Sequence, residues 1–217
     1  MSKIYIIALL LITSVSTNAQ IKKGSISLGG ELFYYNEKLQ IENLQEKYES
    51  GTIGISIGKA FKENSVAGFN FGFSPIKQTY YPNANEMINL TYKSFNIGAF
   101  FREYKMLAKD LYFFGQLDGA FITTNQFLDY SVAATDVKAK ERGGFISIMP
   151  GISYQVFKKL QLELTIPNIL SMQYRMTKFE SENPQYKNSR NNQFMFYSNL
   201  NNKLSLSWLG VGFRFIL

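Results

Sequence analysis

The chain has 217 residues, a formal net charge of +7 and a composition that is 46% hydrophobic and 16% aromatic, with neither Cys nor His. Without Cys the chain has no disulfide framework and no lipoprotein anchor. Without His it has no Ser-His-Asp or Cys-His arrangement and no His-ligated zinc. The lysines lie singly or in pairs at predicted turns, which is typical of a solvated rim and excludes a nucleic-acid interface.

The N-terminal segment has the three parts of a secretory signal peptide. Lys3 precedes a short apolar run at 4–12, and Ala19 supplies the small residue before a cleavage point. The apolar run is too short to span a bilayer as a helix. We expect residues 1–19 to be removed and residues 20–217 to form a single domain.

The remaining chain alternates apolar and polar residues with a period of two, which is the pattern of β-strands. Phe69 and Phe71, for example, flank Asn70. Pro150 predicts a bulge or a missing rung, because proline cannot donate to a ladder, and Pro167 predicts a shift of register. The eight expected strands are 25–35, 52–60, 65–74, 91–104, 111–123, 144–157, 160–174 and 194–217.

The connections between these strands alternate in length. The short ones are 61–64, 105–110 and 158–159, and the long polar ones are 36–51, 75–90, 124–143 and 175–193. This alternation along an even number of strands is typical of an outer-membrane barrel. The prediction is an all-β fold, an eight-stranded antiparallel up-and-down transmembrane β-barrel with short periplasmic turns and long extracellular loops.

The polar face of the strands decides which side meets lipid. It is rich in small uncharged residues such as Gly54, Ser56, Gly58 and Gly72. Such residues favour a crowded barrel interior, as in an eight-stranded barrel that is just wide enough for side chains. The Phe- and Ile-rich face then contacts lipid. The alternative is a soluble lipocalin-like barrel or sandwich with the apolar face inside.

The last strand carries the motif that suggests a family. Gly212, Phe215 and Leu217 resemble the C-terminal signal by which bacterial outer-membrane barrels are recognised for insertion, although Gly210 and the terminal Leu depart from its usual form. A change of apolar parity near Trp208 predicts a bulge there.

With this motif and the expected architecture, the mature chain resembles the small OmpA/OmpX-type outer-membrane β-barrel family of Gram-negative bacteria. The resemblance implies a porin-like monomer in the cell outer membrane. It also implies contact with outer-membrane lipid, and help from the barrel-assembly machinery during insertion.

One constellation of charged residues is expected inside the barrel. By strand parity the inward-pointing residues include Glu31, Arg102, Asp118, Glu163 and Arg214. Arg214 is expected between Glu163 and Glu31 on the flanking strands, and charges in a narrow lumen should be paired. This lumen ion-pair network predicts either a plug that fills the barrel or a gated pore.

The residues favour no enzymatic chemistry. The expected strands show no close carboxylate pair on one face, and the chain lacks P-loop and dinucleotide fingerprints. We expect no catalytic, cofactor-binding or metal site. The predicted function is structural, with surface interaction through the extracellular loops. The alternative is a narrow channel for small solutes, and the sequence does not indicate which ligand the loops would bind.

Overall fold

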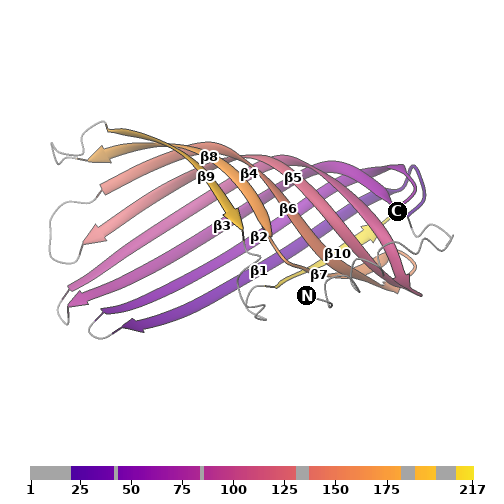
Figure 1. Cartoon of the computed structure of the whole chain (residues 1–217), viewed down its shortest axis with the longest axis horizontal. Coiled ribbons are helices and arrows are strands. Elements are labelled where there is room, and N and C mark those ends of the chain that lie inside the picture. Colours follow the sequence, from indigo (N-terminus) through magenta and orange to yellow (C-terminus); the bar gives the residue numbers. More distant parts are fainter. Residues whose placement is uncertain (1–20, 42–43, 84–85, 131–136, 182–188, 199–208) are drawn as a thin grey trace, which may run out of the picture.

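The computed structural model describes residues 21–41, 44–83, 86–130, 137–181, 189–198 and 209–217, so the expected signal peptide lies outside it. Within these ranges ten antiparallel strands form one sheet that curls into a tilted barrel (Figure 1). No helix in these ranges is long and apolar enough to cross a membrane. The strands are β1 (Ile26–Ile41), β2 (Leu44–Lys62), β3 (Ser65–Asn83), β4 (Glu86–Ala108), β5 (Leu111–Tyr130), β6 (Val137–Phe157), β7 (Leu160–Thr165), β8 (Leu170–Ser181), β9 (Arg190–Ser198) and β10 (Gly210–Ile216).

The sheet closes through its first and last strands. Strands β1 to β7 pair in sequence order, and β10 lies between β7 and β1, with Arg214 opposite Gln161 on one side and Gly29 on the other. Within the described residues β1 to β7 and β10 therefore form a closed ring of eight. Strand β8 pairs with residues 137–148 of β6, and β9 pairs with β8.

The count of ten strands corrects the expected eight, because the last two expected strands are each divided. The expected seventh strand breaks at Pro167 into β7 and β8, and Asn168 there has a positive φ of 51°. The register shift predicted at Pro167 is confirmed. The expected eighth strand becomes β9 and β10, and the bulge predicted near Trp208 lies outside the described residues.

The missing rung predicted at Pro150 is also confirmed. Strand β6 pairs with β7 at Gly151 and with β8 at Ile148, and it has no ladder partner between these two points. Pro150 still accepts a hydrogen bond from the Ile166 backbone N–H at 3.0 Å. On the other side of β6, strand β5 pairs continuously, with Gly115 opposite Pro150 and no register shift. Pro150 therefore lies where the partner of β6 changes from β7 to β8. Proline is tolerated at this point because no N–H is needed there for a ladder hydrogen bond.

The long polar loops expected from the sequence are mostly strand, which is a second correction. Strands β2 to β6 have 19 to 23 residues, whereas about 9–11 suffice to cross a bilayer. The ladder between β1 and β2 runs from Ile26 opposite Lys59 up to Ile41 opposite Leu44. We call this end of the barrel the hairpin end, and the end with the turns near Asn64, Asp110 and 158–159 the turn end.

The outer face of the barrel carries a belt of exposed apolar side chains. Ile55 is 61% exposed and Phe69 is 62% exposed. The polar residues Ser56 and Asn70, which pair with each other between these positions, point inward. The belt covers the strand halves nearer the turn end. Other members from around the ring are Leu32, Ile97, Phe121, Ile146, Leu164 and Val211.

A small apolar cluster lies inside the turn end. Ile21 is fully buried among Ala60, Val66, Phe100 and Phe114. Its backbone N–H donates to the Asn64 side chain at 3.2 Å, and its carbonyl oxygen accepts from the Asn64 N–H at 3.0 Å. The segment before β1 therefore folds across the turn end and places one apolar side chain into the lumen.

Candidate functional site

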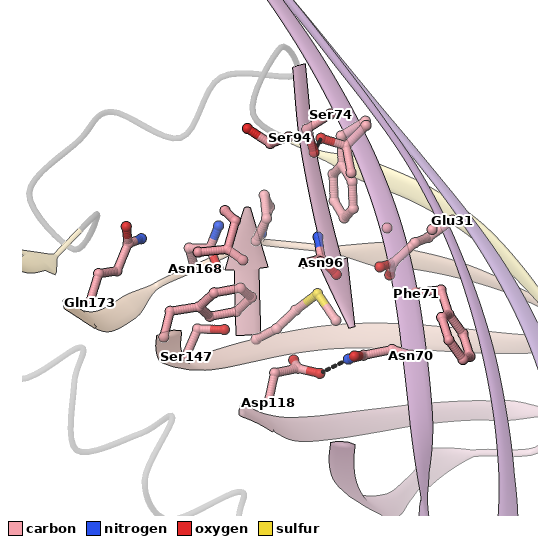
Figure 2. A pocket seen from close by; sticks show the side chains of 18 of the residues that line it. Glu31, Asn70, Phe71, Ser74, Ser94, Asn96, Asp118, Ser147, Asn168 and Gln173 are labelled. Carbon is pink, nitrogen blue, oxygen red and sulfur yellow. Dashed lines mark hydrogen bonds between the residues drawn. The ribbon is translucent and has the colours of Figure 1, made fainter. Parts of the chain in front are cut away.

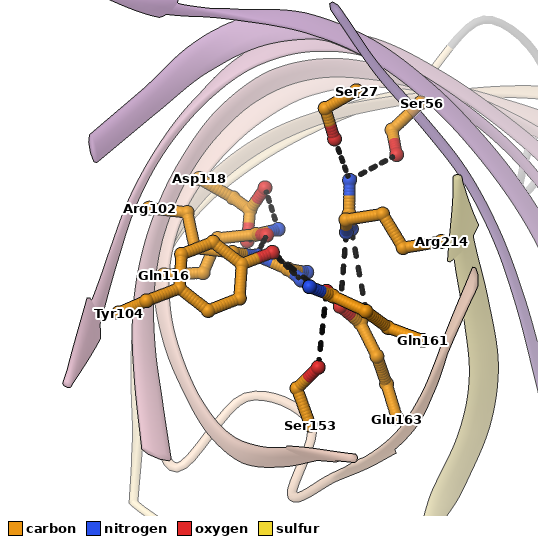
Figure 3. A network of polar contacts seen from close by, with 10 residues as sticks. All are labelled: Ser27, Ser56, Arg102, Tyr104, Gln116, Asp118, Ser153, Gln161, Glu163 and Arg214. Carbon is orange, nitrogen blue, oxygen red and sulfur yellow. Dashed lines mark hydrogen bonds and ion pairs between the residues drawn. The ribbon is translucent and has the colours of Figure 1, made fainter. Parts of the chain in front are cut away.

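The five charged residues expected in the lumen come from five strands, β1, β4, β5, β7 and β10. Arg102, Glu163 and Arg214 are 1%, 4% and 3% exposed, and they meet inside the ring of strands (Figure 3). Asp118 is buried as well, and Glu31 is partly buried. The structure brings three of the five into direct contact and leaves Glu31 and Asp118 outside the ion pairs.

Glu163 is the centre of the network. Its Oε1 accepts hydrogen bonds from Arg102 Nη1 at 2.6 Å and from Arg214 Nε at 2.9 Å, and its Oε2 accepts from Arg214 Nη2 at 3.4 Å. Charge-assisted bonds of this kind are stronger than neutral ones, and both partners are out of water. One carboxylate from β7 therefore holds guanidinium groups that arrive from β4 and β10.

Neutral side chains also bind Arg102, although its buried Nη2 has no hydrogen-bond partner in the described residues. Its Nε donates to Gln116 Oε1 at 2.6 Å, and its Nη1 donates to the Tyr104 hydroxyl at 3.1 Å. The guanidinium carbon lies 4.0 Å from the centre of the Phe114 ring, a cation–π arrangement. Sequence reasoning did not include these three residues, although the aromatic residues on both faces at the start of β5 were a signal that aromatic rings enter the lumen.

Of its two expected partners, Arg214 pairs with Glu163 and not with Glu31 in the described residues. Its Nη1 donates to Ser27 Oγ at 2.9 Å and to Ser56 Oγ at 3.4 Å. A Cβ at Gly29 would lie 2.9 Å from the Arg214 guanidinium carbon. The glycine therefore leaves the space into which Arg214 extends, toward the serines and away from Glu31.

Among the described residues Glu31 and Asp118 form no ion pair. There Asp118 accepts hydrogen bonds from the amides of Gln116, at 2.8 and 2.9 Å, and Asn70, at 2.7 Å. Glu31 lies against Gly54, where a Cβ would be 2.7 Å from its Oε1. Within the described part of the chain Glu31 has neither a hydrogen bond nor an ion pair.

A cavity of about 350 Å³ lies next to these two carboxylates (Figure 2). On β4 its lining residues Ser94 and Asn96 lie toward the hairpin end, whereas Arg102 lies toward the turn end. The cavity is therefore on the hairpin side of the ion-pair network. Its wall is mixed. Apolar side chains such as Phe33, Phe145 and Met149 line it together with small hydroxyl and amide side chains, among them Thr52, Asn70, Ser74, Ser94, Asn96 and Ser147.

The residues of the expected insertion signal occupy both faces of β10. Gly212 faces the lumen opposite Glu31 and Glu163, and a Cβ there would lie 2.9 Å from the Gly30 carbonyl oxygen. Phe215 and Leu217 are exposed on the outer face. Recognition of these three residues during insertion stays a prediction.

The described residues contain no group of three or more Asp, Glu, His or Cys side chains that could hold a metal ion. Their lumen chemistry is that of buried ion pairs and hydrogen bonds.

No family model matches the chain, and no curated protein matches it in sequence. Solved structures do match in fold. The outer membrane protein OprG from Pseudomonas aeruginosa is 11% identical with a TM-score of 0.51, and the match covers 92% of this chain and 99% of that one. The outer membrane protease OmpT from Escherichia coli is 8% identical with a TM-score of 0.43, over 89% and 91%. Neisserial surface protein A is 13% identical with a TM-score of 0.37, over 89% and 97%.

The match to OprG spans nearly the whole of both chains. The chain has the fold of an outer-membrane β-barrel. At 11% identity the likeness extends to the fold alone, and any role in binding or transport rests on this chain's own residues.

Proposed function

We propose that this chain is an integral outer-membrane β-barrel whose lumen is closed by side chains and whose long hairpins act at the cell surface. The observation that carries the proposal is the buried Arg102–Glu163–Arg214 network in the middle of the lumen. On the turn-end side of this network lies the apolar cluster around Ile21. The network and the cluster thus form two successive layers of side chains across the lumen.

The apolar belt supports a lipid surround. Exposed Ile, Phe and Leu side chains from every part of the ring form one continuous band, which is far more apolar surface than soluble monomers expose. The band disfavours the soluble lipocalin-like alternative, in which the apolar face would be inside. In the proposal outer-membrane lipid covers this band and the protein is a monomer.

The orientation and biogenesis belong to the same proposal. Residues 1–19 direct export, and the barrel-assembly machinery recognises Gly212, Phe215 and Leu217. The turn end then faces the periplasm and the hairpin end faces outward. The resemblance to OmpA/OmpX-type barrels is retained in its general form, a small barrel with a filled interior, with no catalytic role.

The hairpin wall beyond the belt is polar and charged, as a surface in water requires. On β2 the Lys47 ammonium lies 2.7 Å from Glu49 Oε1. This contact raises the pKa of Lys47 and lowers the pKa of Glu49, so both groups are charged at neutral pH. We therefore assign the surface role, which was expected for extracellular loops, to the walls of the long β-hairpins.

Cell fractionation combined with gel mobility tests the membrane assignment. We expect the protein in the outer-membrane fraction, and we expect an unboiled sample to migrate differently from a boiled one, because a closed barrel resists detergent until it is heated. A freely soluble periplasmic product with a single mobility would overturn the proposal.

The second candidate is a narrow channel, and the cavity of about 350 Å³ above the network favours it. In a channel the Arg102–Glu163–Arg214 contacts would act as a gate that opens. The two functions differ in one measurable property, which is the conductance of the unmodified protein.

A further inference from the structure

The cavity on the hairpin side of the network has the size and wall of a ligand site. Its volume of about 350 Å³ falls within the roughly 300–1,000 Å³ typical of small-molecule pockets. The wall combines hydroxyl and amide groups with apolar side chains such as Phe33 and Phe145. Among the amides, Oδ1 of Asn70 is a buried oxygen without a hydrogen-bond partner. Its Nδ2 donates to Asp118, so its oxygen is an acceptor that no donor in the described residues satisfies.

The charges around the cavity do not balance. The charged residues that line it are Glu31, Asp118 and Arg175. Arg175 has its own counter-ion, because its Nη1 lies 3.2 Å from Glu141 Oε2. Within the described residues Glu31 and Asp118 form no ion pair. The neighbouring network has two guanidinium groups and one carboxylate, so its surplus positive charge offsets only one of these two carboxylates. One carboxylate charge at the cavity therefore stays uncompensated, in a place where unpaired charge is costly.

The cation that fits this cavity is organic. No group of three or more metal-ligating side chains exists in the described residues, and the cavity is much larger than a single dehydrated ion. A primary ammonium group supplies up to three donors for Glu31, Asp118 and the Asn70 oxygen. The mixed wall of hydroxyl, amide and apolar side chains then surrounds the rest of the molecule.

We propose that this cavity binds a small organic molecule carrying a primary ammonium group, with Glu31 and Asp118 as its counter-ions. The site goes beyond the proposed closed barrel, since binding on the hairpin side of the network needs no passage through it. Ser50, which lines the cavity, lies on β2 beyond the apolar belt and toward the hairpin end.

Calorimetric titration of the refolded full-length protein in a non-ionic detergent tests the site, with putrescine as probe and uncharged 1,4-butanediol as its matched control. Putrescine should bind, and butanediol should bind at least about tenfold more weakly, since a bond to a charged group contributes roughly 1.5–3 kcal/mol. Equal binding of both compounds, or no putrescine binding at millimolar concentration, overturns the proposal. So does displacement of putrescine by an equal concentration of Mg²⁺, which points to an inorganic site.

Glu31→Gln is the decisive variant, because Glu31 has no bond in the described chain to lose and the change removes only its charge. It should weaken putrescine binding about tenfold or more. Asp118→Asn should act in the same direction. Glu103→Gln is the control, because Glu103 is exposed at the turn end. Undiminished binding by both cavity variants, or an equal loss in the control, overturns the assignment. The gel mobility of unboiled samples shows whether each variant is folded. Closure of the lumen is tested separately by conductance, so a failure to bind putrescine would not contradict the closed lumen.

Discussion

At the residue scale, the lumen is organised by one carboxylate that serves two arginines. Strand parity alone was enough to predict that Glu31, Arg102, Asp118, Glu163 and Arg214 face inward. Parity could not predict the partners, because these depend on how far each side chain reaches along a tilted barrel. Arg214 extends past Gly29 to the serines and Glu163, while Glu31 turns toward Gly54. The space at such glycines is a property of the assembled wall.

Replacing Glu163 tests its central position. Glu163→Gln leaves two buried guanidinium groups without a counter-ion, and the free energy of unfolding should fall by about 3–5 kcal/mol. Urea-induced unfolding of the protein in lipid vesicles measures this loss.

The matched control is Glu103→Gln, the same chemical change at an exposed site 3.9 Å from Lys62. It should change stability by no more than about 0.5 kcal/mol. Equal stability of the Glu163 and Glu103 variants would contradict the assigned network.

At the element scale, the strands crossing the belt were predictable and their continuation was not. Across the belt one face is apolar and the other polar, so the period of two is visible in the sequence. Beyond the belt the outer face becomes polar as well, as at Lys47 and Glu49, and the period disappears. The backbone ladder continues regardless of side-chain polarity, which is why the expected loops proved to be strand. Pro150 and Pro167 did reveal where pairing changes, because proline lacks the donor a ladder needs.

The close approach of β2 and β3 gives a prediction about glycine. A Cβ at Gly68 would lie 2.1 Å from the Ile57 carbonyl oxygen and 2.4 Å from the Gly58 Cα. Because these are backbone atoms, Gly68→Ala must push the strands apart, and it should cost about 1–3 kcal/mol of stability.

At Gly115, by contrast, an added Cβ meets nothing within 4 Å. Gly115→Ala should be neutral or slightly stabilising in the same unfolding assay. If Gly68→Ala were tolerated as well as Gly115→Ala, the register between β2 and β3 would be wrong.

At the scale of the whole molecule, the barrel has a lipid face and three successive layers inside: the apolar cluster around Ile21, the ion-pair network and the cavity. The sequence indicated the two faces through the contrast between Phe and Ile on one and Gly and Ser on the other. It did not indicate the cavity, which depends on strands meeting around a closed ring.

The lipid face can be tested at Ile55, which is 61% exposed within the belt. Ile55→Arg places a charge against the hydrocarbon and should disfavour insertion by about 2–4 kcal/mol if the residue lies near the midplane. Ile55→Leu keeps the face apolar and should insert normally. The yield of heat-modifiable barrel on refolding into vesicles reports both, and equal yields would show that this face does not meet lipid.

The central claim, that side chains close the lumen, is tested most directly by recording the unmodified protein in a planar lipid bilayer. If Arg102, Glu163 and Arg214 close the lumen together with the apolar cluster, as proposed, ions have no continuous path, and the membrane should show little or no conductance. An Arg214→Ala variant removes part of the network and could show a small leak, which would locate the closure. A large and steady conductance from the unmodified protein would contradict the closed lumen and establish the channel in its place.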